Sequence, residues 1–176
     1  MKINLGCGRK YLAGYVNCDV VTRIKADKHF DLNVVPYPFE PGCADEILLD
    51  NVLEHLDNIP QVMGELHRIL RVGGVLRIYV PYGKSDVALQ DPTHRHYFTE
   101  KSLDYFTGGD ACDFYSPARF RAGRAELYCV RTNFGHTLRN CLPFKQVLRY
   151  FLYNIYDGIY FELEKAEWVA PGASEA

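Results

Sequence analysis

Five short segments with apolar residues, separated by glycine, proline and acidic positions, occupy the first half of the chain. They are too short for stable helices, and most are rich in Ile, Leu or Val, a pattern typical of strands buried in a sheet. Prolines at positions 36, 38 and 41 predict a loop over residues 34–42, because proline fixes φ and lacks a backbone donor. The strands are expected at Lys2–Leu5, Tyr15–Val20, Lys28–Leu32, Asp45–Leu49 and Val75–Val80.

The clearest helix is expected between the fourth and fifth of these strands. Asn58 can cap it, Pro60 falls in its first turn, and Gln61 stands where a capping box places Glu or Gln. Gly73-Gly74 is expected to end it. The order of strand, helix, Gly-Gly, strand and proline indicates a βαβ unit, which predicts a parallel sheet with a right-handed crossover. The apolar face of the helix consists of Val62, Leu66, Ile69 and Leu70.

After Pro81 the pattern is less regular. Thr99 is expected to cap a short helix that carries Leu103 and Phe106. Two further strands are expected at Ala125–Thr132 and Ile159–Glu164. We find no internal repeat and no linker, so residues 1–170 are predicted to form a single domain with an insertion at about 82–123, followed by a disordered tail at 171–176.

Two of the connections between the predicted parallel strands are unusually short. Only six residues separate Gly8 from Tyr15, and only a handful separate Val20 from Lys28. A crossover that contains a full helix needs a dozen or more residues. We therefore expect the first two crossover helices to be reduced, leaving part of one sheet face bare unless the aromatic second half or a second copy of the chain covers it.

Polar side chains and glycines stand where the first four strands end. Glycines at a strand end let a ligand approach the backbone, and acidic side chains there suit ribose hydroxyls and an exocyclic amine but repel a pyrophosphate. Tyr11 replaces the third glycine of the dinucleotide fingerprint G-x-G-x-x-G. The set therefore indicates a nucleoside ligand without phosphates. Its members are Gly6, Gly8, Asp19, Asp31, Asp50 and Asn51.

Taken in order, these residues resemble the class I S-adenosylmethionine-dependent methyltransferases, in particular small enzymes of the methyltransferase type 11 kind. The resemblance covers about residues 2 to 82 and implies an α/β fold with a Rossmann-like, mostly parallel sheet of seven strands, the last antiparallel. The matching segments are Asn4-Leu5-Gly6-Cys7-Gly8, Asn17-Cys18-Asp19, Asp31-Leu32 with Pro38-Phe39, Ala44-Asp45-Glu46-Ile47, Asn51-Val52-Leu53-Glu54-His55-Leu56 and Glu65-Leu66-His67-Arg68-Ile69-Leu70-Arg71-Val72-Gly73-Gly74.

The resemblance implies S-adenosyl-L-methionine as the cofactor, held at the ends of the first four strands. Asp19 would bind the ribose, and Asp31 with Leu32 would contact the adenine. The segment Val52–Leu56, in contrast, is interpreted as packing rather than chemistry. The other cofactor residues would surround the methionine part or, for the last two, the acceptor: Gly6, Gly8, Asp50 and Asn51.

The densest polar chemistry lies in the segment from Asp91 to Thr99. His94 or His96 could be the general base that takes a proton from an acceptor hydroxyl, since imidazole titrates near neutrality. The spacing of Asp91, His94 and His96 also suits a transition metal, and hydrogen-bonded loop histidines are a third interpretation. Asp-Pro-Thr-His segments occur, by resemblance, in small-molecule and glycan-modifying methyltransferases, which favours the first. Catalytic residues are therefore expected at His94 and His96, acceptor contacts at Tyr82 and Arg95, and no bound metal.

Composition and charge narrow the choice of partners. The chain of 176 residues is 48% hydrophobic and 24% charged with a net charge of −2, which is ordinary for a globular domain and gives no sign of nucleic-acid or membrane binding. Six cysteines without C-x-x-C spacing suit a reducing compartment, and with no signal peptide or membrane span expected we predict a cytoplasmic protein. The 14% of aromatic residues is expected to form the acceptor pocket and a homodimer surface.

The function that these observations favour is methyl transfer from S-adenosylmethionine to a small-molecule or glycan-type acceptor, with oxygen as the expected acceptor atom. Two alternatives remain open. One is a catalytically inactive methyltransferase-like partner subunit, suggested by the reduced helices and the aromatic surface. The other is a nicotinamide-dependent oxidoreductase, which Tyr11 and the acidic strand ends disfavour.

Overall fold

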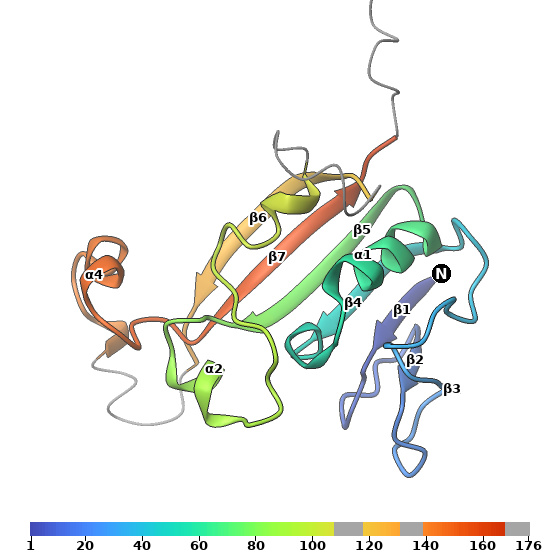
Figure 1. The fold of residues 1–176 in the computed structure, drawn as a ribbon, viewed down its shortest axis with the longest axis horizontal. Coiled ribbons are helices and arrows are strands. Elements are labelled where there is room, and N and C mark those ends of the chain that lie inside the picture. Colours follow the sequence, from blue (N-terminus) through green and yellow to red (C-terminus); the bar gives the residue numbers. More distant parts are fainter. Residues whose placement is uncertain (108–117, 131–138, 168–176) are drawn as a thin grey trace, which may run out of the picture.

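The computed structural model describes residues 1–107, 118–130 and 139–167, and within them a seven-stranded sheet dominates (Figure 1). The strands lie side by side in the order β3-β2-β1-β4-β5-β7-β6. The fold class expected from the sequence is confirmed. The strands are β1 Lys2–Leu5, β2 Tyr15–Asp19, β3 Lys28–His29, β4 Ala44–Asp50, β5 Leu70–Pro81, β6 Phe120–Tyr128 and β7 Gly158–Lys165.

The first five strands are parallel and the last one reverses the direction. β1 lies in the middle of the parallel part, with Asn4 opposite Asn17 of β2 and Leu48 of β4. β7 runs antiparallel to both β5 and β6. The carboxyl ends of β1, β2, β3 and β4 therefore meet at one edge of the sheet, where α/β proteins bind their ligands.

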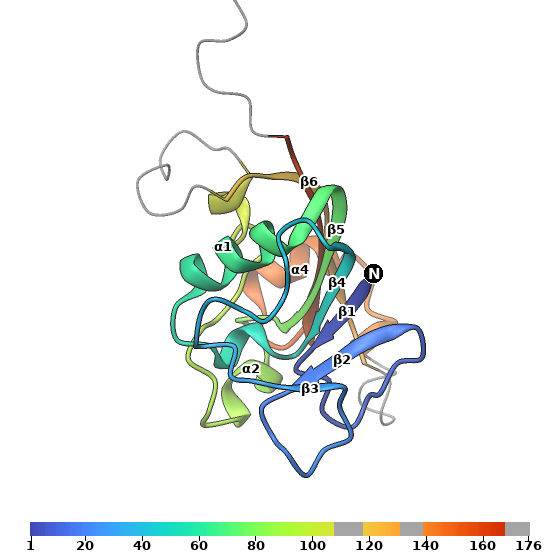
Figure 2. The same cartoon turned by 90° about the vertical axis from the view of Figure 1, so that its right-hand side faces the viewer.

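The helix α1, Ile59–Ile69, packs on one face of the sheet (Figure 2). Its start is the expected one, because the Asn58 side chain accepts a hydrogen bond of 3.1 Å from the Gln61 amide. It ends earlier than expected: β5 begins at Leu70, and Gly73-Gly74 lies within that strand instead of closing the helix. Four side chains of α1 are buried against the core: Val62, Met63, Leu66 and Ile69.

The other helices of the described residues are short. They are α2 Asp86–Gln90, α4 Lys145–Phe151 and the 3-10 turns η1 Leu53–His55 and η2 Asp104–Phe106. The helix expected after Thr99 is thus only a 3-10 turn, although Leu103 and Phe106 are buried as their spacing suggested. The expected tail at 171–176 lies outside the described residues. No helix in the described ranges is both long enough and apolar enough to cross a membrane.

The first two crossovers contain no helix, as their lengths predicted. Residues 6–14 and 20–27 are turns and extended chain, so within the described chain no helix covers the sheet face opposite α1 near β1 and β2. This face differs from the expected apolar patch, because it carries a ladder of polar side chains. Arg77 lies 3.5 Å from Glu46 and 3.4 Å from Glu162, and Tyr15 donates a hydrogen bond to Glu46. Such a face can remain in water without a covering helix.

Candidate cofactor and acceptor site

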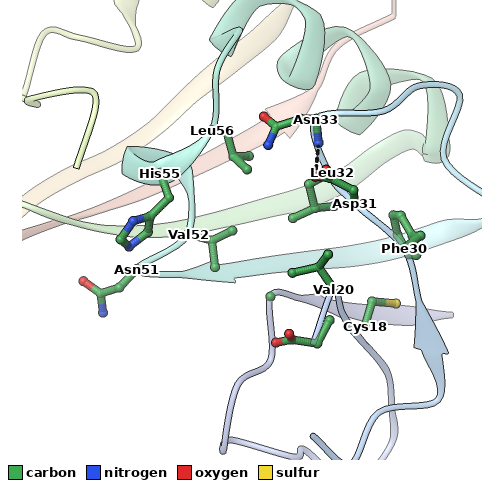
Figure 3. A pocket seen from close by; sticks show the side chains of 12 residues that line it. Cys18, Val20, Phe30, Asp31, Leu32, Asn33, Asn51, Val52, His55 and Leu56 are labelled. Carbon is green, nitrogen blue, oxygen red and sulfur yellow. Dashed lines mark hydrogen bonds between the residues drawn. The ribbon is translucent and has the colours of Figure 1, made fainter. Parts of the chain in front are cut away.

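A cavity of about 290 Å³ lies at the carboxyl ends of β1, β2 and β4, below the loop that contains η1 (Figure 3). Asn51 and His55 lie at one end of it and Phe30 at the other. Its described lining contains two carboxylates and no Lys or Arg, so it suits an uncharged or cationic nucleoside better than a phosphate. The lining consists of Gly6, Cys18, Asp19, Val20, Phe30, Asp31, Leu32, Asn33, Asn51, Val52, His55 and Leu56.

Asp19 is fixed at the end of β2 with its carboxylate toward the turn after β1. One oxygen accepts a hydrogen bond of 2.8 Å from the Gly8 amide, and the other accepts one of 2.9 Å from the Val21 amide. The side chain is almost fully buried. A carboxylate has about four lone-pair sites, so each oxygen keeps one for a further donor such as a ribose hydroxyl.

The opposite end of the cavity suits a flat aromatic ring. Phe30 and Leu32 line it from the chain after β3, and Leu56 lines it from the loop after β4. Asp31 accepts a hydrogen bond of 2.8 Å from the Asn33 amide, which fixes the turn that presents its carboxylate to the cavity. An adenine ring would here have apolar contacts on its faces and an acceptor for its exocyclic amine.

Gly6 is the glycine at which the backbone comes closest to the cavity. Its φ of +65° is in the left-handed region, and a Cβ added there would lie 2.5 Å from Val52 Cγ2. Gly8 also has a positive φ, of +51°, but a Cβ would meet nothing within 4 Å. At position 6, glycine is favoured both by the positive φ and by the lack of space for a Cβ. At position 8, it is favoured by the positive φ alone.

A second cavity of about 560 Å³ adjoins the first and shares Gly6 and Asn51 with it. Lys10 and Asp50 form an ion pair in its wall. Asp50 and Asn51 both line this second cavity, beside the nucleoside cavity.

The residues expected to contact the acceptor or to act in catalysis do not form one site in the structure. Tyr82 is buried, with 5% of its surface exposed, and lines neither of these two cavities. The Arg95 side chain is exposed and paired with Asp57. His96 Nε2 lies 2.9 Å from the Leu56 carbonyl oxygen. Of the expected set, only His94 belongs to a polar cluster beside the nucleoside cavity.

That cluster joins the segment after Asp91 to η1. The carbonyl oxygen of Glu54 accepts hydrogen bonds of 2.8 Å and 3.2 Å from the amides of Arg95 and His96, so the two segments are fixed together. The rings of His94 and His55 are 4.8 Å apart, and His94 Nε2 lies 4.0 Å from Glu54 Oε1. His55 also lines the nucleoside cavity.

Glu54 has no hydrogen-bond partner on either carboxylate oxygen, although only 1% of its surface is exposed. Burial, together with the nearby charges of Asp50 and Asp91, raises its pKa to about 7. The sequence interpretation of Val52–Leu56 as packing alone missed Glu54 and His55. An acidic residue inside an apolar run does not by itself predict such a site, because the sequence does not show that Glu54 is buried or that His94 lies opposite it.

Comparisons with known proteins lead to the same class of protein as the sheet order and the cavity. Residues 16–78 match the model of a methyltransferase domain family. No curated protein sequence shows significant similarity to the chain.

Solved structures of similar fold are related at low sequence identity. A SAM-dependent methyltransferase of Archaeoglobus fulgidus has a TM-score of 0.67 and 15% identity, over 93% of this chain and 85% of that one. A SAM-dependent methyltransferase of Methanosarcina mazei has a TM-score of 0.58 and 14% identity, over 95% and 92%. The [4+2]-cyclase SpnF has a TM-score of 0.59 and 13% identity, over 95% and 75%. The fold is thus shared with a protein named for a different reaction.

The sheet order, the family match and the cavity confirm the resemblance inferred from the sequence. The described chain has the Rossmann-like fold of the class I S-adenosylmethionine-dependent methyltransferases, and residues 16–78 match a methyltransferase domain family. S-adenosylmethionine is the cofactor that these matches support, and the donor set and the open backbone at Gly6 fit its nucleoside.

Proposed function

We propose that the protein transfers a methyl group from S-adenosylmethionine to a hydroxyl of a small-molecule or glycan-type acceptor. The observation that carries the proposal is the nucleoside cavity, with Asp19 and Asp31 at strand ends and a polar histidine cluster beside the end lined by His55. Bound S-adenosylmethionine supplies an electrophilic methyl group on a sulfonium. The task of the chain is to hold that group and the acceptor oxygen in line, which can contribute about 7 to 11 kcal/mol.

In this proposal the chain binds the cofactor along the edge formed by four strands. Asp19 accepts from the ribose hydroxyls, and Asp31 accepts from the adenine amine. Lys10 and Asp50 exchange their mutual ion pair for contacts with the carboxylate and ammonium of the methionine part. The acceptor then approaches from the side of Asn51 and His55.

His94 is the residue that we assign to the acceptor proton. Its Nδ1 lies 2.8 Å from the Ala88 carbonyl oxygen, which holds the proton on that nitrogen and leaves the Nε2 lone pair free. When the acceptor oxygen forms its bond to the methyl carbon, the carbon–sulfur electron pair returns to sulfur and the hydroxyl proton passes to Nε2. The products are a methyl ether and S-adenosylhomocysteine. A positioned base of this kind contributes about 10²- to 10⁴-fold.

The choice of acceptor class rests on the segment Asp91-Pro92-Thr93-His94, which resembles segments of small-molecule and glycan-modifying methyltransferases. A hydroxyl needs its proton removed during transfer, and the cluster supplies a base for it. The proposal includes a cytoplasmic location, in keeping with the free thiols of the five described cysteines.

Binding of S-adenosylhomocysteine, measured by titration calorimetry, tests the cofactor part. We expect a one-to-one complex that Asp19→Ala weakens at least tenfold, because the ribose loses its acceptor. Glu126→Gln, on the exposed part of β6, serves as the control and should bind like the unaltered chain. Absence of binding, or equal binding by the Asp19 variant, would contradict the proposal.

Incubation with labelled S-adenosylmethionine and fractionated metabolites tests the transfer. Labelled product that is lost in the Asp19 variant supports an active enzyme. Cofactor affinity without transfer to any fraction would favour an inactive partner subunit. A nicotinamide nucleotide that binds more tightly than S-adenosylhomocysteine would indicate an oxidoreductase, which the two carboxylates in the cavity wall oppose.

A further inference from the structure

The cluster of Glu54, His55 and His94 has the donor set and the spacing of a metal site. One ligand atom of each residue lies within 4.8 Å of the others. Glu54 Oε1 and His94 Nε2 are 4.0 Å apart, which is too far for a hydrogen bond. Two ligands of a tetrahedral ion with bonds of about 2.0 to 2.1 Å stand about 3.3 Å apart, so Glu54 and His94 need to approach each other by less than about 1 Å to bind one ion.

The buried carboxylate is the observation that calls for a ligand. Glu54 is 1% exposed and neither of its oxygens has a partner in the described structure. A buried carboxylate without a partner is costly, and proteins normally satisfy it with a cation or with hydrogen-bond donors. The groups that face it are the imidazole of His94 and, farther away, the carboxylates of Asp50 and Asp91.

Both histidines keep one ring nitrogen unprotonated. His94 donates from Nδ1 to the Ala88 carbonyl at 2.8 Å, so its Nε2 carries the lone pair. The Thr93 hydroxyl donates to Asp91 Oδ1 at 2.6 Å and therefore accepts from His55 Nδ1 at 3.0 Å. That bond leaves the lone pair on His55 Nε2. Metal-ligating histidines are typically held by a carbonyl or a carboxylate on the second ring nitrogen, as His94 is by Ala88, whereas His55 reaches the carboxylate of Asp91 through the Thr93 hydroxyl.

We infer that Glu54, His55 and His94 bind one divalent first-row transition-metal ion such as Zn²⁺. Two imidazoles and one carboxylate form the ligand set of many catalytic sites, which keep further positions open for water or substrate. The site differs from the Asp91, His94 and His96 set that the sequence spacing suggested. His96 bonds to the Leu56 carbonyl oxygen, and Asp91 is engaged by Thr93 as an outer partner of His55.

The location gives the ion a role in the proposed methyl transfer, and this part of the inference rests on that proposed function. His55 lines the nucleoside cavity at the end where Asn51 lies, so an open position of the ion is next to the acceptor. A hydroxyl bound to a divalent ion loses its proton far more readily than a free one. With the ion bound, the acceptor oxygen is ligated and deprotonated there, the proton passes to solvent, and His94 serves as a ligand instead of as the base.

Titration of the chelator-treated full chain with Co²⁺ tests the site directly. We expect one equivalent to bind with the visible absorption of a low-coordinate cobalt ion, and Zn²⁺ to displace it. Glu54→Gln and His94→Ala should each weaken binding at least tenfold. Glu126→Gln and His29→Ala, which remove an exposed carboxylate and an exposed imidazole, should not. Thermal unfolding without metal is measured for each variant to show that it is folded. Glu54→Gln is expected to fold, because it keeps the size of the side chain and removes only a buried charge.

Two results would overturn the inference: no Co²⁺ binding by the unaltered chain, or unchanged binding by both ligand variants. The catalytic role is judged separately. Methyl transfer that stops with chelator and returns with Zn²⁺ supports it, whereas transfer that chelator leaves unchanged refutes it. Metal binding without any transfer would refute the proposed function and leave the metal site standing.

Discussion

The two carboxylates in the lining of the nucleoside cavity come from the ends of neighbouring strands. The placement of Asp19 and Asp31 was predictable, because Asp19 ends β2, Asp31 lies two residues after β3, and parallel strand ends converge on one edge. Glu54 was not, since its role depends on His94, forty residues later, and chain spacing cannot bring the two together.

The two glycines of the first turn offer a matched test of close approach. Gly8→Ala should lower the free energy of unfolding by about 1 to 2 kcal/mol, the cost of a left-handed conformation for a residue with a Cβ. Gly6→Ala carries the same strain and also pushes Val52 toward the cavity, so it should cost more and weaken S-adenosylhomocysteine binding. Urea unfolding and calorimetry measure both effects. Equal losses in the two variants would show that the contact with Val52 is unimportant.

At the level of elements, α1 and the parallel strands could be predicted because local signals and burial agree in them. The start of α1 follows from Asn58 and Pro60. The early end of α1 could not be foreseen, since Leu70 has an apolar side chain that suits both helix and strand, and pairing with Ala44 of β4 decides in favour of the strand. β6 likewise begins at Phe120 because it pairs with the end of β7.

Removal of the cap of α1 is the simplest test of this element. Asn58→Ala deletes the acceptor for the Gln61 amide and should destabilise the protein by about 1 kcal/mol, whereas Asn58→Ser should restore most of the loss. Chemical denaturation of the three chains gives the comparison. A neutral Asn58→Ala substitution would show that the helix is held by packing alone.

The contact between α1 and β6 predicts a pH dependence of stability. Burial and the charge of Lys165 lower the pKa of His67, whose ring packs edge to face on Phe120 at 5.2 Å. The unfolded chain therefore binds this proton more readily, and the protein should lose stability as the pH falls below about 6.5. His67→Leu should reduce that loss between pH 7.5 and 5, as measured by urea unfolding at each pH. An identical pH profile for both chains would contradict the assignment.

At the scale of the whole molecule, the order of the seven strands could be expected only from the family resemblance. Local patterns place strands along the chain but do not say that β7 inserts between β5 and β6. The polar ladder on the face opposite α1 was also beyond prediction, because Glu46, Arg77 and Glu162 come from three distant strands. Among the described aromatic residues of the second half, Phe98, Phe106 and Phe161 are buried in the core, whereas Tyr150 and Phe151 are exposed on α4.

The exposed surface of α4 is where we propose the homodimer contact. None of its residues is buried, and Phe144 and Phe151 are 81% and 80% exposed. An apolar surface of this kind marks an interaction site more often than a free face. Sedimentation equilibrium should give twice the 20.2 kDa mass of one chain. Val147→Lys with Phe151→Lys should give the single mass, and Val34→Lys, at another exposed valine, should leave the dimer intact.

The position of β7 has a consequence for the synthesis of the chain. β7 is the last strand to be made, yet it lies between β5 and β6, and β6 pairs with no other described strand. During synthesis, β5 and β6 therefore each have an unpaired edge until residues 158–165 have left the ribosome. Strand pairings between residues so distant in sequence form slowly. The sheet should therefore be completed only after β7 has been synthesised, and nascent chains stalled before β7 should remain sensitive to protease over β6 but already protected over α1.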